Sequence, residues 1–106
     1  MRAVCRTKDV PSVGGLRVVL LGLEPFAVFR DGGAYFVTAD TCTHGAASLA
    51  DGEVIDGEIE CPFHHGAFDL RTGEATQPPC TVPLRIYPCE VRDGVVYIQI
   101  PPPEQP

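Results

Sequence analysis

The sequence predicts an all-β protein, and three observations support this. Apolar and β-branched residues alternate with polar residues along much of the chain. Two turn sequences typical of tight β-hairpins, Asp31-Gly32-Gly33 and Asp93-Gly94, lie between such stretches. No segment shows a sustained 3.6-residue period, and the eleven glycines and eleven prolines oppose long helices. A chain of 106 residues is short enough to form a single domain, residues 1–106.

The longer strands are expected at the two ends of the chain. At the start they are expected at residues 2–6, 16–23, 25–30 and 34–39, with the Asp31-Gly32-Gly33 turn before the last of them. At the end they are expected at residues 84–92 and 95–100, joined by the Asp93-Gly94 turn. We expect these ends, about residues 1–40 and 84–106, to form a β-sandwich-like antiparallel base.

The middle of the chain, about residues 41–83, has a different texture. Short strand candidates at residues 53–55, 58–60 and 67–70 are interrupted by glycine and proline, and residues 46–50 have room for only one turn of helix. All three histidines and three of the five cysteines lie in this segment. Because loops on rigid β scaffolds commonly carry function, we expect an inserted functional subdomain here.

Charge is distributed unevenly along the chain. The net charge is −6, which disfavours nucleic acid and anionic membranes as partners. Residues 31–70 contain eight acidic residues and no lysine or arginine, whereas the remainder has a net charge of +2. Two interpretations are open: a solvated acidic face that maintains solubility, and a field that steers the protein toward basic patches on its partners.

Other features bear on location and redox state. No apolar run approaches the ~18 residues of a membrane span, and the first residues lack the apolar stretch of a signal peptide. The odd number of cysteines excludes complete internal disulfide pairing. These features predict a cytoplasmic protein in which cysteine binds metal or packs as a small apolar residue.

Two short clusters carry residues of the kind that bind metals. They are Cys42-Thr43-His44 and Cys61-Pro62-Phe63-His64, with sixteen residues between them. Together they offer two thiolates and two imidazoles to one centre. These donors suit either a tetrahedral zinc site or a 2Fe–2S cluster in which two histidines replace two cysteines on one iron. Gly45 and Gly66 follow the clusters, and we expect them to supply turns with φ > 0.

The pattern C-T-H-G, a gap of sixteen residues and then C-P-F-H-H-G resembles the Rieske signature. The resemblance covers almost the whole chain and includes the proline-rich segment 77–83. It is closest to the small Rieske ferredoxins of bacterial multicomponent aromatic-ring dioxygenases, including the carbazole type. The resemblance implies a Rieske fold in which residues 41–83 form the 2Fe–2S cluster-binding subdomain. It also implies a ligand set, with two sulfurs on one iron and two ring nitrogens on the other: Cys42, Cys61, His44 and His64.

The same resemblance implies a one-electron carrier and not an enzyme. Its implied donor is an NAD(P)H-dependent flavoprotein reductase, and its implied acceptor is a terminal oxygenase that hydroxylates aromatic rings. A monomer is expected, because a shuttle must meet two partners in turn. Two alternatives stay open: a small Rieske subunit of a reductase complex of the nitrite reductase type, and a zinc-stabilised interaction module without a redox role.

Departures from the high-potential Rieske proteins of respiratory and photosynthetic complexes carry information. Those proteins place a serine and a tyrosine hydroxyl near the cluster sulfurs, and the matching positions here are Gly66 and Phe68. The loss of these donors implies a potential near the low end of the Rieske range, about −150 mV.

The remaining histidine and cysteines receive structural interpretations. His65, next to His64, is expected to rim the docking surface. Cys80 is expected to be a packed thiol in the loop that covers the cluster. Cys5 and Cys89 lie in strand patterns and are expected to fill the core.

Overall fold

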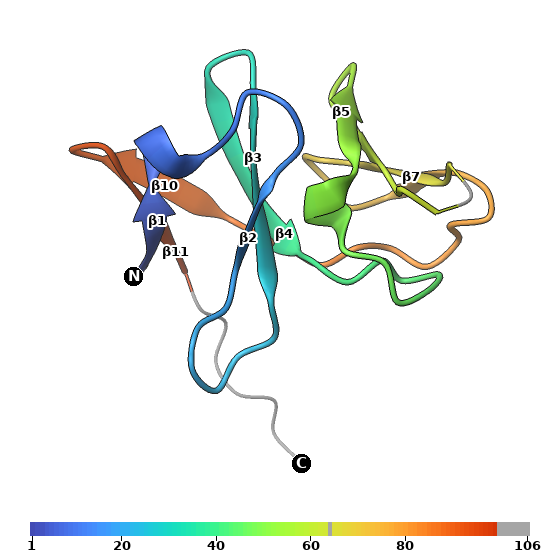
Figure 1. Ribbon diagram of the computed structural model, residues 1–106, viewed down its shortest axis with the longest axis horizontal. Coiled ribbons are helices and arrows are strands. Elements are labelled where there is room, and N and C mark those ends of the chain that lie inside the picture. Colours follow the sequence, from blue (N-terminus) through green and yellow to red (C-terminus); the bar gives the residue numbers. More distant parts are fainter. Residues whose placement is uncertain (64, 100–106) are drawn as a thin grey trace.

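Three antiparallel sheets form the protein (Figure 1), in a computed structural model that describes residues 1–63 and 65–99. The first sheet has the order β1-β11-β10: β1 (Arg2–Arg6), β11 (Val95–Ile98) and β10 (Cys89–Arg92). The second has the order β2-β3-β4-β9: β2 (Leu16–Val18), β3 (Phe26–Asp31), β4 (Ala34–Ala39) and β9 (Ile86–Tyr87). The third follows chain order: β5 (Glu53–Ile55), β6 (Glu58–Glu60), β7 (Ala67–Asp69) and β8 (Ala75–Gln77).

The prediction of an all-β protein is confirmed. The helical segments in residues 1–63 and 65–99 are two single 3₁₀ turns, η1 (Thr7–Asp9) and η2 (Leu49–Asp51). Neither is long and apolar enough to cross a membrane. The third sheet comes from residues 53–77, and the other two sheets come from residues 2–39 and 86–98.

Three hairpins turn on two-residue loops in which both residues have positive φ. These are Gly32-Gly33 (59° and 86°), Asp56-Gly57 (51° and 79°) and Asp93-Gly94 (49° and 75°). Such pairs match the right-handed twist of the flanking strands, and aspartate and glycine tolerate this conformation best. The first and last turns were predicted, and the Asp56-Gly57 turn joins β5 to β6.

Several strand boundaries differ from those predicted. The strand expected at residues 84–92 is divided at Pro88, where the chain leaves β4 in the second sheet and pairs with β11 in the first. Proline has no N–H group to donate to a neighbouring strand, so it suits the point where the chain passes from one sheet to the other. The strand expected at residues 16–23 ends at Val18, before Gly22 with its φ of 82°. Strand β8 was not predicted, and Ile100, the expected end of the last strand, lies outside the described residues.

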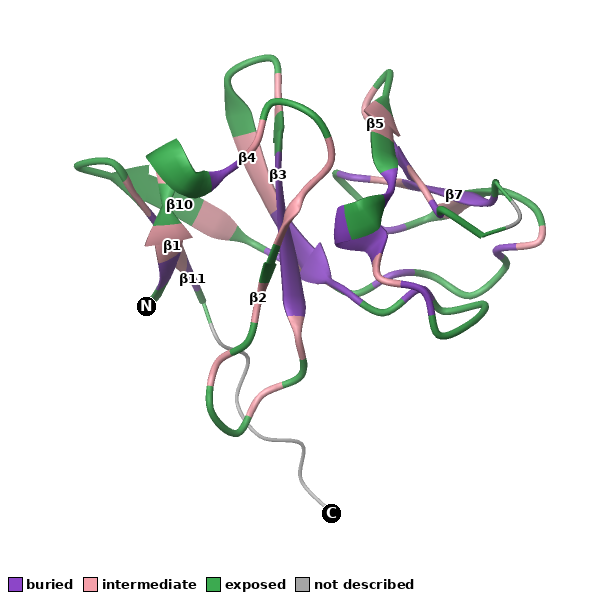
Figure 2. Cartoon of the chain, viewed as in Figure 1, coloured by how far each residue is buried: buried purple, intermediate pink, exposed green. Residues whose placement is uncertain are grey.

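Strand β3 is buried on both faces and connects two hydrophobic cores (Figure 2). Phe26 and Val28 belong to a core shared with Val96 and Ile98 of the first sheet. Ala27 and Phe29 point the other way, into a core built with the third sheet and residues 42–50. Because successive side chains of a strand face opposite sides, one apolar run supplies both cores.

Asp40 ties the end of β4 to the segment that follows it. Its side chain is only 3% exposed and accepts three hydrogen bonds: from Arg17 Nε at 3.1 Å, Ser48 Oγ at 2.8 Å and the N–H of Ala50 at 3.1 Å. Its backbone carbonyl accepts a further bond from the N–H of Leu49 at 2.7 Å. The buried carboxylate therefore closes the loop of residues 41–49 onto the second sheet.

We expect Asp40→Ala to destabilise the protein by about 2–3 kcal/mol, because it leaves the buried N–H of Ala50 and the hydroxyl of Ser48 without their acceptor. In a domain of this size the thermal midpoint should fall by roughly 10–20 °C. Asp51→Ala is the matched control, since Asp51 is exposed and lies on the same loop. Melting followed by circular dichroism tests this, and equal midpoints for the two variants would contradict it.

Candidate metal centre

The first predicted pair lies on the loop that leaves β4. Cys42 is 3% exposed, and its N–H donates to the carbonyl of Ala47 at 2.9 Å. Thr41 and Ser48 form a β-bridge just outside this bond, so residues 42–47 form a closed turn. His44 lies on this turn and is exposed, whereas Cys42 is buried.

The second predicted pair lies on the loop between β6 and β7, which is built in the same way. Cys61 is 2% exposed, and its N–H donates to the carbonyl of Gly66 at 2.6 Å, again five residues ahead. His64 lies outside the described residues. The two cysteines therefore hold equivalent positions on two similar turns.

A third segment, residues 78–83, packs against the first loop. The hydroxyl of Thr43 donates to the carbonyl of Val82 at 2.8 Å. Cys80, which is 4% exposed, places its Sγ atom 3.8 Å from Sγ of Cys42. The prediction that Cys80 is a packed thiol is confirmed. Its contact with the sulfur of Cys42 was not predicted.

The environment keeps two of these thiols protonated. Burial raises the pKa of Cys61 to about 11, together with its hydrogen bond to Cys42, while the N–H of Phe63 acts in the opposite direction. Burial, again with a hydrogen bond to Cys42, raises the pKa of Cys80 to about 12. A metal that binds Cys61 must therefore displace its proton.

The role predicted for Gly45 and Gly66 is wrong, because neither has a positive φ. Among the described residues of the second loop, His65 has the left-handed conformation, with a φ of 59°. Gly66 is needed for space, since a Cβ atom there would overlap Sγ of Cys80. A Cβ at Gly45 would meet nothing within 4 Å. The sequence identifies the glycine at position 66, but only the packing shows that its small size matters there and not its freedom to adopt a positive φ.

His65 is exposed and contacts an acidic side chain. Its Nδ1 lies 3.3 Å from Oε1 of Glu60, and both residues line a surface hollow of about 260 Å³ with Asp56 and Glu58. An exposed pair of this kind adds little stability. The contact turns the His65 ring toward β6.

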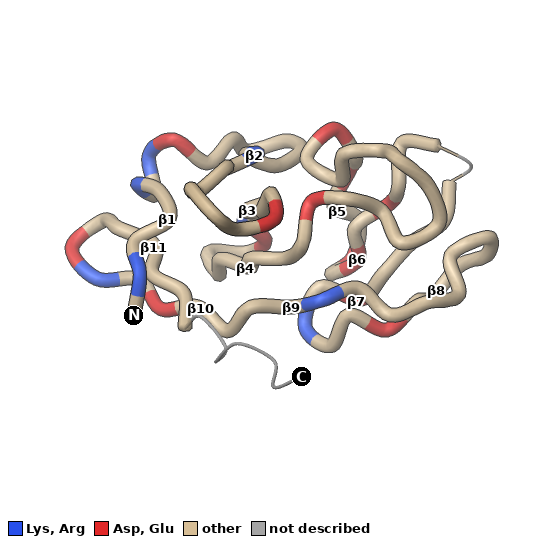
Figure 3. Tube along the Cα trace, turned by 90° about the horizontal axis from the view of Figure 1, so that it is seen from below, with Lys and Arg blue, Asp and Glu red and all other residues tan. Residues whose placement is uncertain are grey.

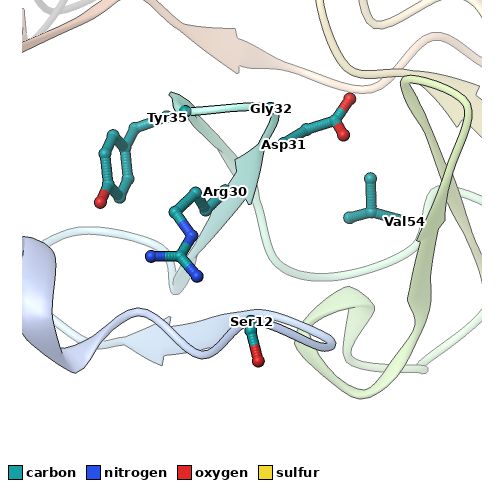
Figure 4. A pocket seen from close by; sticks show the side chains of 7 residues that line it. Ser12, Arg30, Asp31, Gly32, Tyr35 and Val54 are labelled. Carbon is teal, nitrogen blue, oxygen red and sulfur yellow. The ribbon is translucent and has the colours of Figure 1, made fainter.

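Another hollow lies at the tip of the β3–β4 hairpin (Figure 4). It has a volume of about 490 Å³ and is lined by Ser12, Arg30, Tyr35 and Val54, among others. None of its lining residues is cysteine or histidine, so it offers no donor set for iron or zinc. Among the described residues, no three His, Cys, Asp or Glu side chains are arranged to hold a single metal ion.

Comparison with known proteins identifies the fold and the centre. Residues 1–88 match the family model of the Rieske [2Fe-2S] domain. The chain is 46% identical over 95 residues to ferredoxin CarAc of Metapseudomonas resinovorans, covering 90% of this chain and 89% of the relative. It is 41% identical over 98 residues to the ferredoxin component of the p-cumate 2,3-dioxygenase system of Pseudomonas putida, covering 92% and 83%.

A solved structure shows the same fold. A chain in the complex of reduced oxygenase and oxidized ferredoxin in carbazole 1,9a-dioxygenase matches with a TM-score of 0.83 and 45% identity, covering 92% of this chain and 99% of that chain. The chain belongs to the Rieske [2Fe-2S] domain family. Within it, the chain is a ferredoxin component of aromatic-ring dioxygenase systems, an electron carrier and not a catalyst.

The family brings a Rieske 2Fe–2S cluster as cofactor, and the donor chemistry fits it. Cys42 and Cys61 are buried on equivalent turns, as thiolate ligands of an iron–sulfur cluster need to be. The alternatives of a zinc module and a nitrite reductase subunit are set aside by these matches.

We expect Gly66→Ala to reduce cluster content, because the added methyl group collides with Cys80 and separates residues 78–83 from the second loop. Overpacking of this kind costs about 1–3 kcal/mol. Gly45→Ala, on the equivalent first turn, is the control and should load normally. The ratio of iron to protein after identical purification tests this. Equal iron content in both variants would show that the contact does not constrain the site.

Proposed function

We propose that this ferredoxin carries one electron at a time from an NAD(P)H-dependent flavoprotein reductase to a terminal oxygenase that hydroxylates aromatic rings. The observation that carries the proposal is the pair of matched turns, each with a buried cysteine, at the end of the molecule away from the β10–β11 hairpin (Figure 1). The structural relative in the carbazole 1,9a-dioxygenase complex supports an oxygenase as acceptor. The five cysteines form no disulfide with one another, which suits a cytoplasmic location.

We assign the sulfurs of Cys42 and Cys61 to one iron and the imidazoles of His44 and His64 to the other. The contrast in burial supports this, since both cysteines are buried and His44 is exposed. When bound, the cluster supplies reversible one-electron storage. The protein excludes water from the sulfur side with Phe68, Leu70 and residues 78–83, and the exposed imidazole marks the surface where a partner docks. On this proposal residues 41–83 form the cluster-binding subdomain, and about 1–40 and 84–106 form its base.

The ligand assignment is tested by paired histidine variants. His64→Ala should lose the rhombic EPR signal that appears on reduction, while its neighbour variant His65→Ala should keep that signal and two irons per chain. Cys61→Ala should also lose iron, and Cys89→Ala on β10 should retain it. The reverse outcome for the two histidines would overturn the assignment of His64. A colourless wild-type protein containing zinc would overturn the proposed function as a whole.

Residues 31–70, which include both cysteine turns, contain eight acidic residues and no lysine or arginine. Figure 3 shows acidic residues on β5, β6 and β7 and at the β10–β11 hairpin, and basic residues near β1, at the same hairpin and between β7 and β9. Phe63 and Val82, on the second loop and the third segment, are 57% and 56% exposed. An apolar tip beside acidic side chains suits weak, fast docking on a partner with a basic rim.

We expect Asp56→Asn to slow electron transfer to the oxygenase by about twofold at low salt, since it removes one charge from the acidic side. The difference should vanish at high salt, where the Debye length falls to about 3 Å. Asp93→Asn is a closely matched control, because Asp93 holds the same place in an Asp-Gly turn with positive φ on the far hairpin. Stopped-flow rates at several salt concentrations test this, and equal behaviour of both variants would exclude steering from this side.

The packing around the sulfurs supports a low potential. Phe68 is fully buried, and Gly66 carries no side chain, so neither position supplies a hydroxyl group. With fewer hydrogen bonds to its sulfurs the reduced cluster is less stabilised, so its reduction potential is lower.

A further inference from the structure

Cys80 is the thiol whose position neither the fold nor the proposed ligand set explains. It lies 38 residues from Cys42 in sequence, yet their Sγ atoms are 3.8 Å apart, within hydrogen-bond distance for two sulfurs. Either sulfur could be the donor of this bond. The positions that carry hydroxyl donors in the high-potential Rieske proteins are occupied here by Gly66 and Phe68. A thiol donor at Cys80 therefore supplies a hydrogen bond that these two residues cannot make.

The direction of the hydrogen bond follows from the ligand chemistry. A cysteine that binds iron does so as a thiolate and has no proton to donate. With Cys42 bound to iron, the proton between the two sulfurs must therefore belong to Cys80. A neutral S–H group then donates to a ligand sulfur that carries negative charge, and such charge-assisted bonds are the stronger kind.

The surrounding contacts hold Cys80 in this position. Its N–H donates to the carbonyl of Gln77 at 3.2 Å, and the residue is only 4% exposed. A Cβ atom at Gly66 would overlap Sγ of Cys80 and come within 3.1 Å of its backbone nitrogen, so the chain leaves space there for this thiol. The bond from Thr43 to Val82 attaches the same segment to the Cys42 loop. Cys80 is thus fixed by backbone and packing, and its thiol is turned toward Cys42.

We propose that Cys80 is a positioning residue that donates an S–H···S hydrogen bond to the Cys42 ligand and raises the reduction potential of the cluster. This rests on the ligand assignment proposed above. Reduction adds one negative charge to the cluster, so a donor to its sulfur stabilises the reduced form more than the oxidised form. The Cys80 thiol thereby replaces part of the stabilisation of the reduced cluster that Gly66 and Phe68, which have no hydroxyl group, do not provide.

Potentiometric titration followed by EPR tests the proposal on the full-length, cluster-loaded protein. Cys80→Ala should lower the ratio of reduced to oxidised protein at a fixed potential by about threefold to tenfold; tenfold corresponds to 59 mV for one electron. Cys80→Ser keeps a donor and should restore the midpoint to the wild-type value or above it. Cys89→Ala removes a thiol that donates to the carbonyl of Tyr35, away from the centre, and should change nothing.

The outcomes separate this proposal from the ligand assignment. An unchanged midpoint in Cys80→Ala, or a Cys80→Ser midpoint that follows Cys80→Ala, overturns the hydrogen-bond role and leaves the ligands as assigned. Loss of iron and of the rhombic signal in both Cys80 variants would make Cys80 a ligand and overturn the ligand assignment and this proposal together.

A second measurement needs no alanine variant. In redox-difference infrared spectra, the wild-type protein should show an S–H stretching band that moves to lower frequency on reduction, because the bond to sulfur strengthens. Cys80→Ser should lack that band. Absence of any redox-sensitive S–H band from the wild-type spectrum contradicts the proposal.

Discussion

The arrangement of the protein depends on one strand having two apolar faces. Phe26 and Val28 of β3 pack against the first sheet, while Ala27 and Phe29 pack against the core that contains Cys42, Cys61 and Cys80. The two loops that carry Cys42 and Cys61 therefore rest on the same strand that holds the first two sheets together. Because interiors are close-packed and little compressible, this placement fixes the distance from the base to the two turns. A carrier gains from such rigidity, since its centre then changes little in structure when its charge changes.

The polar link made by Asp40 complements this apolar contact. Apolar packing alone is non-directional and leaves a loop free to slide by a fraction of a residue. Two hydrogen bonds to one buried carboxylate, from Ser48 and Ala50, fix where residues 48–50 lie relative to β4, and a third holds the carboxylate to Arg17. The second loop is held in a different way: β6 and β7, which flank it, pair directly with each other, and this pairing fixes its two ends.

Local features of the sequence predicted the structure well, and distant pairings could not be predicted. The turns at Gly32-Gly33 and Asp93-Gly94 follow from two adjacent residues, so they could be read directly. The break at Pro88 depends on β9 pairing with β4, almost fifty residues earlier, and β8 is a strand only because β7 lies beside it. Cys42 and Cys61 could likewise be predicted as candidate ligands, because each belongs to a short cluster of neighbouring residues. The contact of Cys80 with Cys42 arises from the path of residues 78–83, which no short pattern encodes.

The charges and the hydrogen-bond donors around the centre oppose each other. Acidic residues on β5, β6 and β7 disfavour the addition of an electron to a nearby cluster, and their effect weakens with salt because they face water. Donors at the sulfurs, such as the N–H of Phe63 on Cys61, favour the electron and act in a buried place that salt does not reach. If acidic residues are needed for docking, buried hydrogen-bond donors to the sulfurs can counteract the decrease in reduction potential that these charges cause. On the proposed function, partner recognition thus depends on the exposed charges and the reduction potential depends on the buried donors.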